Sequence, residues 1–410
     1  MMKYIPRFKP SFSIWEIILA LRSSLSSKNK DVLCIFADKF ARYIGVRYAI
    51  PVPSARVAFM AILEALKLPQ GGEVIMPSLT FHCIPSILKE FGLRPRFVDI
   101  DLNTNCIDVN KLTREINSST VAIIPVHLYG YACNMQVIRE IADRFDLKII
   151  EDCAQACGGV YRGRRLGSFG DAAIFSFHCH KNFSLLGTGM LVTDSKDLAE
   201  KAASWVNSLN SAGPGALIRQ IIYAIGLCVI TYPLLWRGFM VPVLSICNYL
   251  GFDFIETLTN ESCRGQKKDY RKRYLMPGVF HGFFGLCQLA KIDGINKRRI
   301  ENGEALTKHL GNAIGIAFSS FAPFGENIFS SFVVRVKRKK EFRMRLFRRG
   351  IDSHGGNMFV GPLLPEMEGT GEFANALEAK GCAVHLPIYH QITSQDLLEI
   401  ADAVKFALKE

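Results

Sequence analysis

Short apolar runs alternate with amphipathic helical patterns between about residue 50 and residue 195 of the chain. Alternation of this kind predicts parallel strands joined by crossover helices, which is the signature of an α/β domain. The runs that we expect to be strands cover residues 73–77, 96–100, 121–125, 147–152, 172–177 and 190–193. Because ligands bind beyond the carboxyl ends of strands in such sheets, we expect functional side chains there, at Phe81, His127, Asp152 and Ser176.

Residues 216–252 break this pattern with a strongly apolar stretch. Its uncharged runs, 221–236 and 238–252, are shorter than the roughly 20 residues needed to cross a bilayer, and Pro233 and Pro242 interrupt them. Three interpretations stay open: a hairpin that contacts a membrane surface, a segment that packs on the body or on a second subunit, or a true membrane span. The basic cluster at 264–273, where six of ten residues are Lys or Arg, would suit lipid head groups or a diphosphate.

The last part of the chain, from about residue 275, predicts a smaller α+β domain. We expect a long helix through residues 285–299, a strand at 331–336 and a basic helix at 340–349 that ends at Gly350. The charge run 337–349 is interpreted as a solvated helix face, since no nucleic-acid recognition motif accompanies it. The predicted divisions are an N-terminal segment 1–35, a large domain 36–210, an insertion 211–274 and a small domain 275–410.

Composition narrows the function classes. The chain has 410 residues, of which 49% are hydrophobic and 21% charged, so it can bury large cores and is not a disordered protein. A net charge of +13 favours anionic partners. Twelve dispersed cysteines and a start without an apolar leader indicate a reducing, cytoplasmic compartment, with the inner face of the membrane as the site of any peripheral contact.

The sequence gives no metal site. His178, Cys179 and His180 are the closest candidates, but we expect them on a strand, where alternate side chains point to opposite faces and cannot converge on one ion. The next residue, Lys181, is more informative. An amine just past a strand end can meet the aldehyde of a cofactor.

Two other features point to the same chemistry. Asp152 ends the preceding strand-like run, and Ser54-Ala55-Arg56 opens a helix whose backbone N–H groups and cation can hold a phosphate. A lysine, an acid and a phosphate cradle are what pyridoxal phosphate needs: a Schiff base, a partner for the pyridinium nitrogen and an anion site.

These residues resemble the DegT/DnrJ/EryC1/StrS aminotransferases, the sugar-aminotransferase branch of the fold-type I pyridoxal-phosphate enzymes. The resemblance runs from about Phe36 to the C-terminus without the 210–265 insertion. Residues 52–59 resemble the family's phosphate turn, and Ser176 and Lys181 keep its five-residue offset between the phosphate serine and the Schiff-base lysine. Further matches lie at residues 36–45, 77–81, 125–130 and 151–156. The fold that the resemblance implies is α/β, with a large, mostly parallel sheet domain and a smaller C-terminal α+β domain.

The resemblance also implies roles for single residues. Lys181 would carry the cofactor and then act as the general base, and Asp152 would keep the pyridine nitrogen protonated. Phe81 would lie against the ring and Gln155 would reach the ring hydroxyl. The cofactor phosphate would be held by Ser54, Ala55, Arg56 and Ser176.

Two departures from the family pattern concern binding. Ala55 and Arg56 replace the Gly-Thr of the usual phosphate turn, so the backbone is expected to approach the phosphate less closely. The residues Tyr274-Leu275-Met276-Pro277 replace an Asn-Tyr-Arg-Met segment, which leaves the substrate class open. The offset places Lys181, not His180, at the Schiff-base position, which favours transamination over dehydration.

The expected function is therefore a pyridoxal-phosphate-dependent aminotransferase that moves an amino group, from glutamate, to the keto group of a nucleotide-linked sugar. The resemblance implies a homodimer with sites at the interface. The alternatives are an aminotransferase for a cyclitol or for a lipid-linked keto-sugar at the membrane surface, and a membrane-associated family member without catalysis. The sugar, the ring position, the stereochemistry and the pathway are not given by the sequence.

Overall fold

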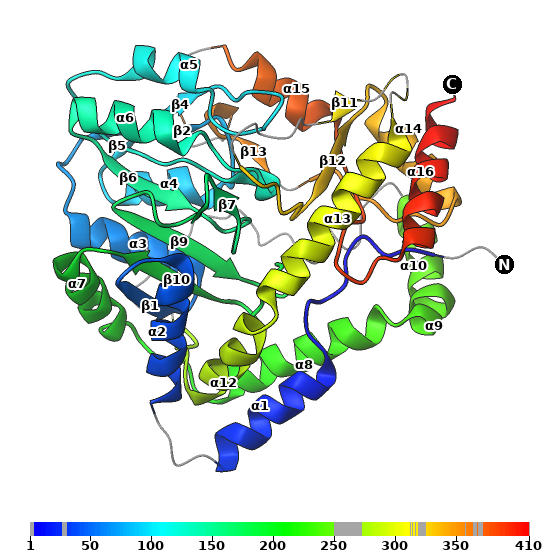
Figure 1. Cartoon of the computed structure of the whole chain (residues 1–410), viewed down its shortest axis with the longest axis horizontal. Coiled ribbons are helices and arrows are strands. Elements are labelled where there is room, and N and C mark those ends of the chain that lie inside the picture. Colours follow the sequence, from blue (N-terminus) through cyan, green and yellow to red (C-terminus); the bar gives the residue numbers. More distant parts are fainter. Residues whose placement is uncertain are drawn as a thin grey trace.

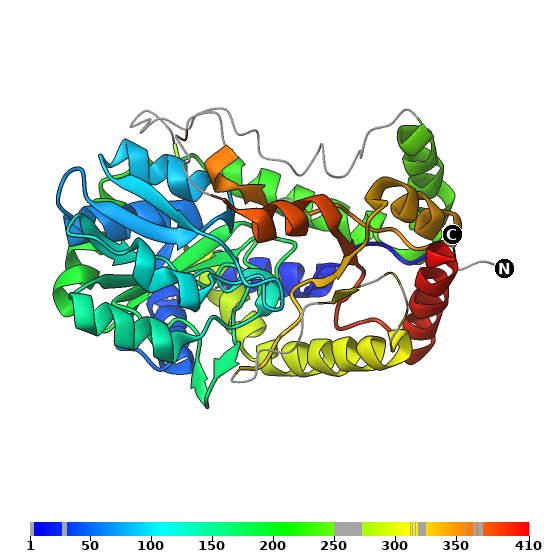
Figure 2. The ribbon, with the colours of Figure 1, turned by 90° about the horizontal axis from the view of Figure 1, so that it is seen from above.

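The computed structural model describes residues 4–26, 31–249, 273–311, 313, 315, 317–318, 325–356, 358–363, 367 and 372–409. A sheet covered by helices forms one end of the molecule, and the C-terminal helices α14 and α16 form the other (Figures 1 and 2). The helix α13 (Ile292–Leu310) runs between the two ends (Figure 1). The basic cluster predicted at 264–273 lies outside the described residues except for Arg273.

A seven-stranded sheet forms the large domain, in the order β1-β10-β9-β6-β5-β2-β4. Its strands are β1 (Tyr48–Val52), β2 (Glu73–Pro77), β4 (Arg94–Val98), β5 (Thr120–Ile123), β6 (Lys148–Asp152), β9 (Ala172–Phe177) and β10 (Thr188–Thr193). All six predicted runs are strands, and the expectation of an α/β fold with a mostly parallel sheet is confirmed.

The strand β10 is an exception to the parallel order, because it pairs antiparallel with both β9 and β1. The chain between β9 and β10 covers residues 178–187, without a helix. A parallel crossover needs a dozen or more residues, so a connection of this length returns the chain as an antiparallel neighbour. The alternating pattern did not predict this reversal, nor did it predict β1.

Helices cover both faces of the sheet and bury its apolar strands. Helix α3 contacts β9, β10 and α7, while α2 contacts β1 and α12. The left-handed conformation of Gly45 ends α2, and Ser54 caps α3 through its side chain. The helices of this part are α2 (Val32–Ile44), α3 (Ala55–Leu66), α4 (Cys83–Glu90), α5 (Val109–Leu112), α6 (Met135–Phe145) and α7 (Lys196–Asn207).

The C-terminal part has its own apolar cluster around a small antiparallel sheet, β11-β12-β14. The single long helix expected through 285–299 is wrong: α12 ends at Leu289 and α13 starts at Ile292. The amide of Lys291 bonds to the carbonyl of Gln288, a tighter turn that breaks the helical ladder. The elements are α12 (Val279–Leu289), β11 (Ala317–Phe318), β12 (Phe332–Arg335), α14 (Lys339–Arg348), α15 (Ala374–Cys382), β14 (Ala383–Leu386) and α16 (Ser394–Leu408).

Short strand pairs connect these parts. In one of them, β3 (Leu79–Thr80) of the large domain pairs with β13 (Phe359–Val360) of the C-terminal part. The pair β7 (Val160–Tyr161) and β8 (Arg164–Arg165) forms a small hairpin. The divisions predicted at residues 35, 210 and 274 stay a proposal, although Ser211 and Tyr274, the two ends of the predicted insertion, pair with each other.

The apolar stretch forms helices. Helix α8 (Gly215–Ile230) is followed by α9 (Pro233–Leu235), a π-helical turn at Trp236–Met240 and α10 (Val241–Tyr249). Among the described residues, no single helix is both long and apolar enough to cross a bilayer. Gly215–Ile230 and Pro233–Cys247 together are long and apolar enough. The two segments are bent by 73° relative to each other, and Pro233 directly follows the break.

Candidate active site

A cavity of about 360 Å³ lies beyond the carboxyl ends of the central strands, between the large domain and the C-terminal part. Every residue that the sequence assigned to the site lines it: Ser54, Ala55, Arg56, Phe81, Asp152, Gln155, Ser176 and Lys181. These side chains span 128 positions of the sequence, from 54 to 181, and the sheet brings them together. The juxtaposition is that expected for ligand binding in an open α/β sheet.

Lys181 lies in the short connection between β9 and β10, where its amide donates to the carbonyl of His178 in a tight turn. Desolvation by burial lowers the pKa of the Lys181 amine to about 8, and the carboxylate of Asp152 opposes that shift. A lysine in this state is uncharged in a large fraction of molecules just above neutral pH, so it can act as a nucleophile and as a base.

Asp152 closes the strand β6 and is 6% exposed. Its Oδ1 accepts a hydrogen bond from the amide of Ala154 at 2.9 Å. Desolvation raises the pKa of Asp152, while the Ala154 bond, Lys181 and His127 act in the opposite direction. The acid and the amine therefore interact electrostatically inside one cavity, where the acid could face the ring nitrogen of the cofactor and the amine its aldehyde.

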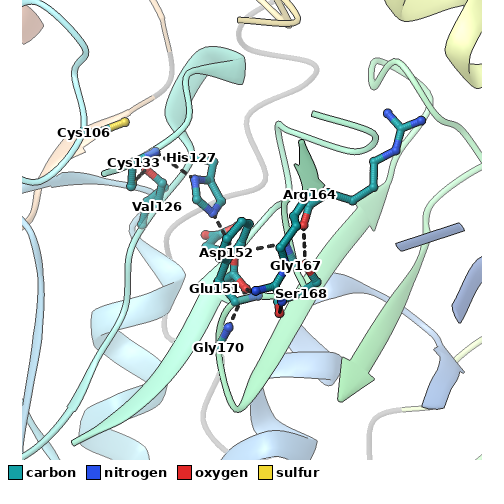
Figure 3. A network of polar contacts seen from close by, with 12 residues as sticks. Cys106, Val126, His127, Cys133, Glu151, Asp152, Arg164, Gly167, Ser168 and Gly170 are labelled. Carbon is teal, nitrogen blue, oxygen red and sulfur yellow. Dashed lines mark hydrogen bonds and ion pairs between the residues drawn. The ribbon is translucent and has the colours of Figure 1, made fainter. Parts of the chain in front are cut away.

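A buried network beneath Asp152 holds the end of β6 in place (Figure 3). Glu151, fully buried, accepts from the amides of Gly167, Phe169 and Gly170, and from Nε2 of His127 at 3.2 Å. The amide of Cys133 donates to His127 Nδ1, so a neutral His127 carries its proton on Nε2 and donates it to Glu151. The network fixes the direction of the strand from which Asp152 projects.

The same network includes a set of side chains with metal-ligand chemistry: His127, Glu151 and Cys153. Both ring nitrogens of His127 and both oxygens of Glu151 take part in the hydrogen bonds described above. Burial raises the pKa of the Cys153 thiol well above its ordinary value, which disfavours the thiolate that binds zinc.

The N-terminus of α3 forms one corner of the cavity. The Ser54 hydroxyl accepts from the amide of Val57, which leaves the amides of Ala55 and Arg56 at the head of the helix. Gly189 of β10 permits a close approach, because a Cβ there would lie 2.6 Å from the amide nitrogen of Ala55. Ser176 is paired with Gly189 across the two strands. The helix terminus, a cation and a hydroxyl therefore gather in one place, a combination suited to a phosphate.

Gln155 lines the cavity, and a backbone contact fixes the orientation of its side-chain amide. Its Oε1 accepts from the amide of Tyr129 at 3.0 Å, and since that group can only donate, the orientation of the side-chain amide is determined. The Nε2 donor then faces the sulfur of Met358 at 3.9 Å, a weak acceptor. Tyr129 itself has a left-handed backbone (φ 59°), a strained conformation typical of functional sites.

Sequence reasoning missed the N-terminal segment, which lines the cavity with Arg7, Phe8, Lys9 and Ser11. Arg7 forms a buried ion pair with Asp352 at 2.7 Å, and the Ser11 hydroxyl donates to the carbonyl of Lys181 at 3.3 Å. No local pattern signals these contacts, because the paired residues are 345 and 170 positions apart.

Sequence reasoning also missed three histidines from the C-terminal part that line the cavity, His354, His385 and His390. The rings of His354 and His385 stack with their centroids 4.4 Å apart. Burial lowers the pKa of His385 to about 3 and that of His390 to about 4, and it lowers the pKa of His354 as well. These rings are uncharged at neutral pH, so this wall offers neutral donors and acceptors.

The placement of His178, Cys179 and His180 corrects one expectation. They lie in the turn after β9 and not on a strand, and the rings of His178 and His180 stack at 5.0 Å. The period-2 argument for their divergence therefore does not apply. The expectation failed because β9 ends at Phe177, and the pattern of hydrophobic and aromatic residues does not indicate that end.

Taken together, the residues present fit pyridoxal phosphate. The cavity supplies a lysine of lowered pKa, a buried acid that interacts with it, a helix N-terminus beside a hydroxyl, and an amide donor whose oxygen is already bonded. Each feature matches one functional group of that cofactor: its aldehyde, its ring nitrogen, its phosphate and its ring oxygen.

Comparisons with known proteins agree with the family resemblance seen in the sequence motifs. Residues 16–215 match the model of the DegT/DnrJ/EryC1/StrS aminotransferase family, and the match ends where α8 begins. The GDP-perosamine synthase of Escherichia coli O157:H7 is 38% identical over 203 residues, which is 49% of this chain and 56% of that enzyme. The spore coat polysaccharide biosynthesis protein SpsC of Bacillus subtilis strain 168 is 28% identical over 97% of this chain and 94% of its own length.

Solved structures share the fold over nearly the whole length. S. venezuelae DesV has a TM-score of 0.75 and 26% identity, with 99% of this chain and 100% of that chain covered. Helicobacter pylori PseC, an aminotransferase, has a TM-score of 0.78 over 99% of both chains, at 18% identity. The family resemblance identified from the sequence motifs is confirmed: residues 16–215, slightly less than half of the chain, match the DegT/DnrJ/EryC1/StrS aminotransferase family.

Proposed function

We propose that the chain is a pyridoxal-phosphate-dependent aminotransferase that transfers an amino group from glutamate to a keto group of a nucleotide-linked sugar. The observation that carries the proposal is the cavity that holds Lys181 and Asp152 together beside the N-terminus of α3. Bound pyridoxal phosphate would supply an electron-withdrawing ring that stabilises negative charge on a neighbouring substrate carbon.

The residues of the chain would do the rest. Lys181 Nζ, with its pKa near 8, would hold the cofactor between turnovers and, once released, would move a proton between the substrate carbon and C4′ of the cofactor. The Asp152 carboxylate would hold a proton on the ring nitrogen, because two buried groups of opposite charge stabilise each other where water is excluded.

The remaining site residues would orient the cofactor. The amides of Ala55 and Arg56, the guanidinium of Arg56 and the hydroxyl of Ser176 would bind the phosphate. Nε2 of Gln155 would donate to the ring oxygen, and Phe81, which lines the cavity, would pack on one ring face.

The relatives support a nucleotide-sugar substrate. Besides the GDP-perosamine synthase, the chain resembles a dTDP-3-amino-3,6-dideoxy-alpha-D-galactopyranose transaminase of Aneurinibacillus thermoaerophilus, with 44% identity over 40% of this chain and 46% of that enzyme. The lining cations Lys9 and Arg299 give the cavity a charge that suits a diphosphate. A cyclitol would lack that diphosphate, which makes it the weaker alternative.

A family member without catalysis would not need to keep a buried lysine at a lowered pKa, since an amine in that environment destabilises the fold. We further propose a homodimer with glutamate as donor. A reducing compartment belongs to the same proposal, because none of the described cysteines is paired in a disulfide.

Borohydride reduction of the purified chain with bound pyridoxal phosphate tests the assignment. We expect mass spectrometry to find the pyridoxyl group on Lys181, and we expect Lys181→Ala to lose the visible absorbance band of the attached cofactor. Lys201→Ala is a matched control, since Lys201 is an exposed lysine paired with Asp197 on α7. Labelling of another lysine, or an unchanged band in Lys181→Ala, would refute the proposed site.

Substrate class is tested separately. Glutamate should convert the bound cofactor to its amine form in the absence of a sugar, and a nucleotide-linked keto-sugar should restore the aldehyde form. Restoration by a free cyclitol ketone, with none by the nucleotide sugars, would overturn the substrate assignment and leave the aminotransferase assignment in place.

A further inference from the structure

The helices α8 to α10 carry a concentration of exposed apolar side chains. Among the described residues, twenty large hydrophobic side chains are exposed, and nine of them lie within residues 215–249. They are Ile218, Ile222, Tyr223, Val229, Tyr232, Leu234, Leu235, Phe239 and Ile246. Leu234 is 75% exposed and Phe239 is 60% exposed. Contiguous exposed apolar surface on a folded chain marks a binding surface.

The exposure is not the result of a loosely attached segment. The inner face of α8 is buried through Ile221, Ala224 and Leu227, which belong to the main core. Further on, Trp236 and Met240 point inward and form a separate apolar cluster with Val241 and Leu244. The segment therefore has a packed face and an outward face, and both are apolar.

The charges on this outward face have one sign. Between residues 211 and 249 the sequence contains no Asp or Glu, and Arg219 and Arg237, its charged residues, are both exposed. Phe347 of the basic helix α14 packs against the apolar cluster of the segment, and Lys340 and Arg348 of that helix are exposed. The surface combines apolar side chains with cations.

The helix α1 (Ile14–Ser26) extends this surface. It lies beside α8 (Figure 1) and exposes Trp15, which is 72% exposed, together with Ile18, Leu19 and Leu25. Tryptophan is enriched where an apolar phase meets water. The outward side chains Trp15, Leu19 and Arg22 repeat the combination of apolar and cationic groups.

We propose that α8, α9 and α10, with α1 beside them, form a docking surface for an anionic lipid bilayer, which they contact in the plane of the interface. Helices that lie on a membrane bury an apolar face at the level of the head groups, and their cations attract anionic lipids. The 73° bend and the packed inner face are consistent with contact at one leaflet.

A second copy of the chain is the rival occupant. A two-fold contact through this surface would bury its cations, Arg219 among them, against the same surface of the partner, which has no Asp or Glu between residues 211 and 249. Like charges in a desolvated interface oppose association. An anionic lipid surface supplies the missing negative charge, so the charge pattern favours lipid.

The docking surface lies next to the active site. The hydroxyl of Tyr223 on α8 is 3.5 Å from Nε2 of His180, and His180 lines the cavity. A Cβ at Gly187, another lining residue, would lie 3.2 Å from the side chain of Gln220. The proposed lipid contact therefore lies directly beside the cavity.

Co-sedimentation of the full-length chain with lipid vesicles tests the proposal. We expect binding to phosphatidylcholine vesicles that contain about 30% phosphatidylglycerol, and weaker binding to phosphatidylcholine alone. Leu234→Glu with Phe239→Glu should lower the bound fraction at least about tenfold, because both side chains would lose their contact with the lipid. The control is Leu377→Glu with Leu398→Glu, two exposed leucines on α15 and α16, which should change binding less than about twofold.

Circular dichroism and transaminase activity without vesicles should be the same in all these variants, since none of the four residues lines the cavity. Arg219→Glu with Arg237→Glu should lower binding to the anionic vesicles and leave binding to phosphatidylcholine unchanged. Failure of the wild-type chain to bind vesicles, or equal binding by Leu234→Glu with Phe239→Glu, would overturn the proposal. A smaller oligomer in that variant, measured by light scattering, would overturn it in favour of a protein interface.

Discussion

Glu151→Gln tests the buried network beneath Asp152. The Glu151 carboxylate accepts four hydrogen bonds: Oε1 from the amides of Phe169 and Gly170 at 2.7 Å each, and Oε2 from the amide of Gly167 at 2.9 Å and from His127. A glutamine at this position has the same shape but a single acceptor oxygen. In either orientation its NH₂ group faces two donors.

The decrease in the free energy of unfolding can be calculated from these hydrogen bonds. Each buried donor left without an acceptor costs about 1–3 kcal/mol, so two of them cost about 2–6 kcal/mol. His127 cannot restore its hydrogen bond by moving the proton from Nε2 to Nδ1, because Nδ1 already accepts a hydrogen bond from the amide of Cys133. Native chains are stable by about 5–15 kcal/mol, so Glu151→Gln removes a large share of the total.

Urea unfolding followed by circular dichroism measures this loss as a lower midpoint with an unchanged slope. Glu140→Gln on α6 is the matched control: Glu140 is exposed and accepts one bond, from Gln136, so the change should cost less than about 0.5 kcal/mol. A free energy of unfolding for Glu151→Gln within about 1 kcal/mol of the wild-type value would show that the carboxylate does not organise this site.

Two further predictions concern the cofactor groups directly. Reductive methylation of the cofactor-free chain should modify Lys181 with a midpoint near pH 8, and Asp152→Asn should move that midpoint lower, since the carboxylate raises the pKa of this amine; a higher midpoint would contradict the pairing. Gly189→Ala should weaken pyridoxal phosphate binding at least about tenfold, because the new Cβ would displace the N-terminus of α3, while Gly294→Ala, with open space around it, should leave the dissociation constant unchanged; equal affinities would refute the phosphate assignment.

Much of the sheet and the core of the site follow from local patterns. Buried parallel strands are continuous apolar runs, so the six strands are visible in the sequence, and the residues that follow them gather at one edge of the sheet. This logic placed Phe81, Asp152 and Ser176 correctly on the cavity wall. The helix opened by Ser54 was equally visible, because its cap is a local hydrogen bond.

Other parts of the site depend on tertiary contacts that have no local signature. Arg7 reaches the cavity because its guanidinium pairs with Asp352, and His385 arrives on an edge strand of the small C-terminal sheet. The break between α12 and α13 has a similar origin: the Lys291 side chain bonds to the carbonyl of Ser11 at 2.8 Å, a contact that helix periodicity does not reveal.

The strand whose direction the alternating pattern predicted wrongly, β10, also builds the corner of the cavity at the N-terminus of α3. Because β10 runs antiparallel to β9, Gly189 lies opposite Ser176, and the missing side chain of Gly189 admits the N-terminus of α3. Because of the same reversal, Lys181 lies in a connection of only ten residues between β9 and β10. Leu186 and Gly187 have positive φ angles, and the chain turns back into β10 there. A parallel strand at this position would need a longer crossover, and the lysine, the hydroxyl and the helix terminus would not be held within one cavity.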